Sequence, residues 1–222
     1  MKNYVMAGAL VALSGLAQGD TVAYWGFNDQ GLPGGGFGFE VSDFPFNADL
    51  GSGVFTLENF NDSSTDGVFD FVQSFAGTDL GSLDGVSGGS FAFQGATDQT
   101  NNGAQAVFSF DGALWMDLDF QFARRGTSTG FNDVSIELFD GVDSLGVVDT
   151  LGAGGSWNLN MYDISALDGV ADASIVFTFD GATSSNGNNR LDNVLISGTV
   201  IPAPGSMALL AIGGLVGVRR RR

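Results

Sequence analysis

The chain has 222 residues and a formal net charge of −17, and it contains neither cysteine nor histidine. Without a thiol or an imidazole, disulfides, serine or cysteine catalytic triads and the usual zinc sites are excluded. The acidity also excludes nucleic-acid binding, because such a surface repels phosphate backbones.

The first 19 residues have the pattern of a secretory signal peptide. Lys2 supplies a positive charge, and Tyr4 to Leu16 is an uncharged run rich in Val, Ala, Leu and Gly. Small residues follow at Ala17 and Gly19, the two positions that a signal peptidase reads. We therefore expect signal peptidase to remove residues 1–19 and the chain from residue 20 onward to be exported.

Residues 20–200 have the size of one domain, and their composition permits a large core. All 20 phenylalanines lie between Phe27 and Phe179, so stability does not require disulfides. All 25 acidic residues also lie in this span, against only Arg124, Arg125 and Arg190. The domain is thus strongly acidic, which favours solubility and mutual repulsion of copies.

Apolar residues in this domain alternate with a period of two, which indicates half-buried strands. The clearest case is 114–123, where Leu114, Met116, Leu118, Phe120 and Phe122 are predicted to share one face. No long helical period is present. Further strands are predicted at 21–27, 53–60, 90–94, 106–110, 134–138, 157–161, 175–179 and 191–200.

Turn signals separate these strands. An Asp-Gly pair occurs six times, and this pair favours tight turns because glycine adopts positive φ without a steric clash. The pairs begin at Asp66, Asp84, Asp111, Asp140, Asp168 and Asp180. Short alternating strands with frequent turns predict an all-β fold, a two-sheet antiparallel β-sandwich of jelly-roll type, with a closed barrel as the alternative.

One strand suggests a contact for sugars. Alternation places Trp115 on the polar face together with Asp117 and Asp119, an arrangement that suits ring stacking and hydroxyl hydrogen bonds. The alternative is that Trp115 packs under a loop or a neighbouring strand. Two carboxylates would suffice for a glycosidase, but nothing in the sequence singles out a catalytic pair, so we predict that the protein is not an enzyme.

No cofactor is predicted, and calcium is the one ion that the composition favours. Oxygen-rich segments occur at 186–189, followed by Asp192 and Asn193, and at 59–66. No EF-hand pattern is present. The alternative is ordinary turn chemistry, in which Asn and Asp side chains bond to the backbone.

The last 22 residues form a tail in three parts. Pro202, Ala203 and Pro204 precede a 12-residue apolar stretch, 207–218, that contains three glycines. This stretch is shorter than the roughly 20 residues of a transmembrane helix, which suggests a transient hold on the membrane. Four arginines close the chain and would stay on the cytoplasmic side: Arg219, Arg220, Arg221 and Arg222.

This order of motif, apolar segment and arginine cluster resembles the PEP-CTERM sorting signal, with alanine in place of the central acid. The resemblance implies that an exosortase-like membrane protease removes residues 201–222 and delivers the protein to the cell surface. Segments 22–28, 120–130 and 187–194 resemble extracellular jelly-roll domains that precede such tails. The prediction is an exported surface or matrix-associated structural or interaction protein, with a carbohydrate-binding module that contacts extracellular polysaccharide as the alternative.

Overall fold

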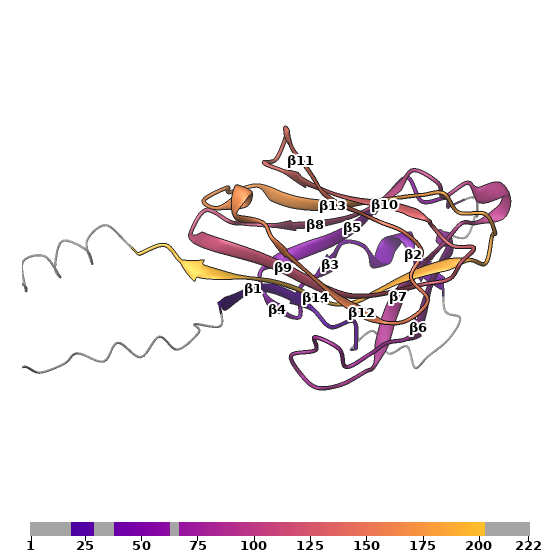
Figure 1. Cartoon of the computed structure of the whole chain (residues 1–222), viewed down its shortest axis with the longest axis horizontal. Helices are drawn as coiled ribbons and strands as arrows, with labels where there is room; N and C mark the ends of the chain where they lie inside the picture. The colour runs from indigo at the N-terminus through magenta and orange to yellow at the C-terminus, as the bar shows by residue number, and fades with distance from the viewer. Residues whose placement is uncertain (1–18, 29–37, 63–66, 203–222) are drawn as a thin grey trace, which may run out of the picture.

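A computed structural model describes residues 19–28, 38–62 and 67–202, which form two packed antiparallel β-sheets (Figure 1). Three short 3-10 helices, η1 (Val41–Asp43), η2 (Thr97–Gln99) and η3 (Ser165–Leu167), are the helical elements of this part of the chain. Sheet A has the order β12 (Asn158–Asp163), β9 (Trp115–Gly126), β14 (Asn188–Val200), β7 (Gly89–Gln94), β6 (Val68–Ala76), β2 (Gly38–Glu40); β1 (Asp20–Trp25) also pairs with β14, and β4 (Leu50–Gly51) pairs with β1. Sheet B has the order β11 (Ser144–Leu151), β10 (Asp133–Phe139), β13 (Ala173–Asp180), β8 (Ala104–Phe110), β5 (Gly53–Glu58), β3 (Phe46–Asn47).

The predicted fold class is confirmed. The chain crosses repeatedly between the sheets, so most neighbours within a sheet are distant in sequence; β8, for example, lies between β5 and β13. This is a two-sheet antiparallel sandwich of jelly-roll type. The strands form two separate sheets, so the alternative prediction of a closed barrel is wrong. Five of the six Asp-Gly pairs show the expected conformation, since Gly67, Gly85, Gly141, Gly169 and Gly181 have positive φ, whereas Gly112 does not.

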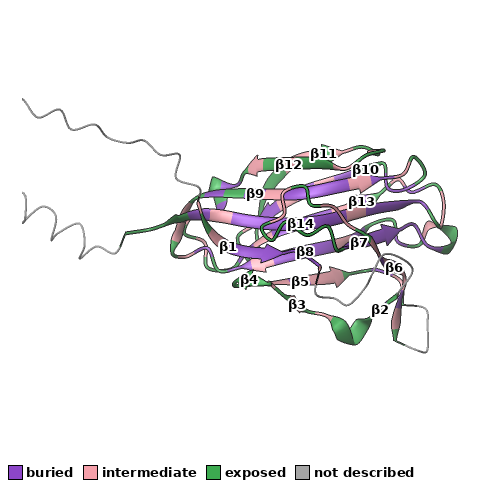
Figure 2. Ribbon diagram, turned by 90° about the horizontal axis from the view of Figure 1, so that it is seen from below, coloured by how far each residue is buried: buried purple, intermediate pink, exposed green. Residues whose placement is uncertain are grey.

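Phenylalanine rings fill the space between the sheets. Inward side chains alternate with outward ones along strands such as β10, whereas β7 and most of β14 are buried on both faces, and Figure 2 shows β14 largely in the colour of buried residues. Phe177 lies at the centre and contacts the rings of Phe108, Phe120 and Phe122 at centroid separations of 5.9, 5.9 and 5.1 Å. The predicted aromatic core is therefore present, with Trp25 buried in it.

All nine predicted strands are present, but two long ones escaped prediction. Strand β6 contains Phe71 at a φ of 64°, which interrupts its alternation. Strand β11 is an edge strand that is mostly exposed, and its pairing with β10 contains two register shifts. Because both strands lack a regular apolar period, the pattern that identified the others failed here.

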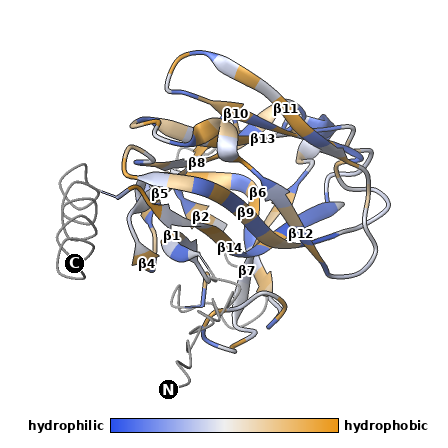
Figure 3. Cartoon of the chain, turned by 60° about the vertical axis from the view of Figure 1, so that its left-hand side comes forward, coloured by the Kyte–Doolittle hydropathy of each residue, from blue (hydrophilic) through white to orange (hydrophobic). Residues whose placement is uncertain are grey.

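The predicted inward face of β9 is wrong at the start of the strand, because the strand contains a β-bulge there. Four residues of β9, from Met116 to Asp119, oppose three of β14, from Ser197 to Thr199, and Asp117 has a φ of 53°. The extra residue exchanges the inward and outward positions that precede it in the chain. Leu114, predicted to face the core, is therefore 68% exposed, and Trp115, predicted to face outward, packs against the core. Figure 3 shows hydrophobic and hydrophilic residues alternating along this strand.

The two described ends of the domain lie side by side, because Asp20 of β1 pairs with Gly198 of β14. The predicted signal peptide lies outside the described residues, apart from Gly19. Of the predicted sorting motif, Pro202 is exposed coil, while Ala203, Pro204 and the four terminal arginines lie outside the described residues. Among the residues that the structure describes, no helix is long and apolar enough to cross a membrane.

Candidate functional site

The outer face of sheet A is partly covered by segment 77–88, which connects β6 to β7. Gln121 Nε2 on β9 donates to the carbonyl of Gly81 at 3.3 Å, so the segment reaches across the sheet. Tyr24 Oη on β1 accepts from the backbone N–H of Leu83 at 3.3 Å and donates to Asn193 Oδ1 at 2.8 Å. These contacts hold the segment against β1, β9 and β14.

A buried carboxylate anchors the start of this segment. An extra residue in β14, Asn193 at a φ of 49°, forms a second bulge and sets its side chain beside that of Asp192. The Asp192 carboxylate accepts the backbone N–H groups of Thr78 at 2.7 Å and Asn193 at 2.8 Å. Desolvation by burial raises the pKa of Asp192 to about 8, outweighing these hydrogen bonds, which act in the opposite direction.

The outer face of sheet B carries a polar row that crosses several strands. Cross-strand register aligns Asn47 of β3 with Val54 of β5, Val54 with Ser109 of β8, and Ser109 with Ser174 of β13. Phe139 of β10 follows Ser174 in the same row. Their chain neighbours Phe55, Phe108, Phe110, Ala173, Ile175 and Leu138 are buried, so these side chains point outward.

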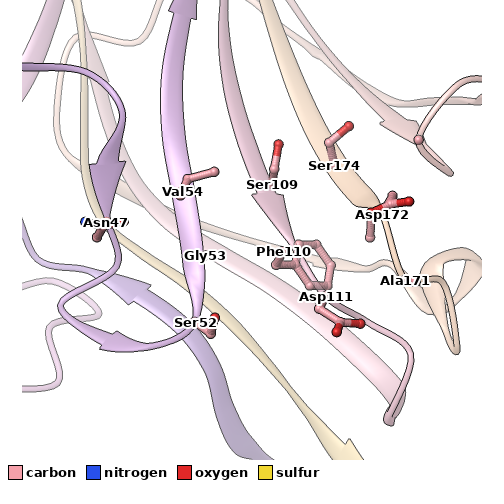
Figure 4. A pocket seen from close by; sticks show the side chains of 12 residues that line it. Asn47, Ser52, Gly53, Val54, Ser109, Phe110, Asp111, Ala171, Asp172 and Ser174 are labelled. Carbon is pink, nitrogen blue, oxygen red and sulfur yellow. The ribbon is translucent and has the colours of Figure 1, made fainter. Parts of the chain in front are cut away.

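A groove of about 500 Å³ lies along this row, at the end of β8 and the start of β13 (Figure 4). Val54, Ser109 and Ser174 are half-buried and form its floor, together with part of the Phe110 ring. Exposed side chains line its margins: Asn47, Ser52, Asp111 and Asp172. Adjacent strands lie about 4.8 Å apart, so the row from β3 to β13 spans roughly 14 Å, longer than one sugar ring.

The groove is rich in hydrogen-bonding groups that the domain itself does not use. Within the described residues, the side chains of Asn47, Ser109, Asp172 and Ser174 have no hydrogen-bond partner, whereas Asp111 Oδ1 accepts the N–H of Ala113 at 2.9 Å. Phe139 is a half-buried ring with no aromatic neighbour among those residues. Unused donors and acceptors beside an outward aromatic suit a polyhydroxylated ligand.

The structure separates the three residues predicted to contact glycan. Trp115 is half-buried and packs against the core cluster, which is the alternative foreseen for it. Asp117 and Asp119 are exposed, and the Asp117 and Leu118 N–H groups donate to the Asp168 carboxylate at 3.0 and 3.1 Å. The bulge therefore removes the shared face on which the prediction rested, because it turns Trp115 inward.

Of the two oxygen-rich segments foreseen for calcium, residues 63–66 of the second lie outside the described residues, and several side-chain oxygens of the first bond to protein donors. Asn189 Oδ1 accepts the N–H of Phe131 at 3.0 Å, Asn188 Oδ1 accepts from Arg190 at 3.2 Å, and Asp192 and Asn193 bond as described above. In the described part of the chain, no group of three acidic residues could hold a metal ion. The calcium expectation therefore stays a prediction from composition.

The three arginines of the domain lie in sheet A and form no ion pair among the described residues. Arg124 is buried and donates to the carbonyl of Gly152, while its Nε has no acceptor; burial lowers its pKa. The guanidinium of Arg190 lies 4.3 Å from the ring centroid of Phe75. Sheet B thus has no described cation on either face.

No family model matches the chain, and no curated protein matches it. Several solved structures match weakly. The CBM22-1 xylan-binding domain of Xyn10C from Paenibacillus barcinonensis is 9% identical over 83% of this chain and 97% of that domain, with a TM-score of 0.43. TmCBM61 in complex with β-1,4-galactotriose is 9% identical over 65% of this chain and 88% of that one, with a TM-score of 0.42.

The active domain of tailspike protein 4 from bacteriophage CBA120 is 20% identical over 64% of this chain, with a TM-score of 0.40. This chain covers only 19% of that tailspike domain's length. At such scores and identities the likenesses assign neither a ligand nor an activity to this protein.

Proposed function

We propose that the protein is an exported, non-catalytic carbohydrate-binding module that holds a polysaccharide in the groove of sheet B. The observation that carries this proposal is the row of unused polar side chains, Asn47, Ser109 and Ser174, which is continued by the outward ring of Phe139. Hydroxyl and amide groups can bond to sugar hydroxyls, while the ring and Val54 offer apolar surface to a sugar face.

Binding is favoured over hydrolysis by the setting of the groove's carboxylates. A glycosidase needs one carboxyl group that stays protonated to act as the general acid, and a desolvated site provides this. Asp111 and Asp172 are both exposed to solvent. The two carboxylates therefore stand in solvent, where they offer hydrogen-bond acceptors to a sugar and lack the desolvated setting of a glycosidase site.

Pull-down on insoluble polysaccharides, followed by titration with soluble oligosaccharides, tests this proposal. We expect Ser109→Val/Ser174→Val to weaken binding at least about tenfold, since ligand hydroxyls would lose their partners at a desolvated contact. Valine is a strong strand former, so the variant should keep its fold. Met161→Ala, at an exposed position of β12 in sheet A, should bind like the wild type.

Failure of the wild-type protein to bind any polysaccharide of a broad panel would refute the proposal. Turnover of a bound glycan would instead identify a hydrolase.

We propose further that the predicted export and tail processing deliver this module to the cell surface. Since β1 begins at Asp20 and β14 ends at Val200, both segments could be removed without cutting a strand of the sandwich. Mass spectrometry of the surface fraction should find peptides that begin at Asp20 and none that cover 207–222. Mature surface protein that retains the arginine-rich end would exclude processing by an exosortase-like protease.

A further inference from the structure

The groove of sheet B carries negative charges and no positive ones, which limits the class of polysaccharide that it accepts. Asp111 and Asp172 are exposed on its margin, at the ends of β8 and β13. Glu137 and Asp140 lie nearby on β10 and the turn that follows it, and Glu137 accepts a hydrogen bond from Ser144. Within the part of the chain that the structure describes, no arginine or lysine lies on sheet B to neutralise these four carboxylates.

The positive charges of the domain also cannot reach the groove. Arg124 and Arg125 belong to β9 and Arg190 to β14, both in sheet A, and Arg124 is buried. An anionic sugar in the groove would therefore meet carboxylates within a few ångströms and no counter-charge within a Debye length of about 8–10 Å on the same face. A neutral sugar would meet the same carboxylates as hydrogen-bond acceptors for its hydroxyl groups.

We infer that the groove selects uncharged polysaccharides and rejects those that carry carboxylate groups, with Asp111 and Asp172 as the residues that set this selectivity. The inference rests on the proposed function and adds the substrate class. Asp172 has the larger share, because its side chain has no partner in the described structure, whereas Asp111 Oδ1 is engaged by the N–H of Ala113.

A matched pair of ligands isolates the charge. One neutral polysaccharide that the wild-type protein binds is compared with the same polymer after oxidation of its primary hydroxyl groups to carboxylates. At low salt we expect the oxidised polymer to bind at least about tenfold more weakly, as two like-charge contacts would produce. Added salt should narrow this ratio, because it screens exposed charges.

Variants distinguish repulsion from the mere loss of sugar hydroxyls. In Asp111→Asn/Asp172→Asn the oxidised polymer should regain most of its affinity relative to the neutral one. Asp79→Asn, an exposed position in segment 77–88 over sheet A, is the matched control and should keep the wild-type ratio.

Equal binding of both polymers by the wild type, or an unchanged ratio in the double variant, would overturn the inference and leave the proposed function intact. Wild-type protein that binds neither polymer would overturn both.

Discussion

Phe177→Ala should lower the free energy of unfolding by about 3–5 kcal/mol, the usual effect of removing a fully buried ring. The side chain is 0% exposed and contacts aromatic rings from both sheets, among them Phe108 of β8 and Phe122 of β9. Its removal would leave a cavity that the rigid strands of two sheets cannot close. Chemical denaturation monitored by circular dichroism gives the difference.

Phe139→Ala is the matched control, because it removes the same side chain from the outward face of the neighbouring strand β10. We expect it to lower stability by less than about 1.5 kcal/mol. Similar losses in the two variants would contradict the assignment of inward and outward faces in sheet B, and with it the position of the groove's floor.

The stability of the domain should fall as the pH rises from about 4 to about 8, because of Asp192. Burial raises the pKa of this carboxyl to about 8, above the value of 3.8 in the unfolded chain. The folded state therefore binds more protons across this window. The stabilisation is complete below the unfolded pKa and is lost as the pH passes the folded one, by on the order of 3–5 kcal/mol.

Denaturation series at several pH values measure this slope in the wild type and in Asp192→Asn. The neutral amide does not titrate, so the variant should be nearly flat over the same window. It should also lose about 1 kcal/mol at low pH, since the amide N–H₂ cannot accept the N–H of Thr78. A wild-type stability that rises between pH 4 and 8, or an equal slope in both proteins, would contradict this view of Asp192.

Local period and turn chemistry were sufficient to predict the fold class and nine of the strands. Ala106, Phe108 and Phe110 alternate as a half-buried strand should, and they line the core. Bulges were outside the reach of this method. One extra residue near Asp117 in β9 reversed the orientation of Trp115, and the sequence around it carries no distinct bulge signal. The predicted shared face of Trp115, Asp117 and Asp119 is absent for this reason, while a sugar contact of these residues stays a prediction.

The groove could not be predicted, because it depends on the register between strands distant in sequence. Ser109 and Ser174 are 65 positions apart, and each reads as an ordinary polar residue between apolar neighbours. Only the pairing of β8 with β13 sets them side by side, and only the pairing of β5 with β3 adds Asn47 to the row. A hint existed for Ser109, which lies between Phe108 and Phe110 of a predicted strand, whereas Ser174 precedes the predicted strand 175–179.

The most direct test of the central claim is to map the binding surface by NMR, following backbone amide shifts during titration with an oligosaccharide of the bound polymer. Groove binding predicts that the largest changes occur at Val54, Ser109, Asp172 and Ser174, with little change at Gln121 or Leu195 of sheet A. Changes centred on sheet A or on Trp115, Asp117 and Asp119, with those four amides unmoved, would contradict it.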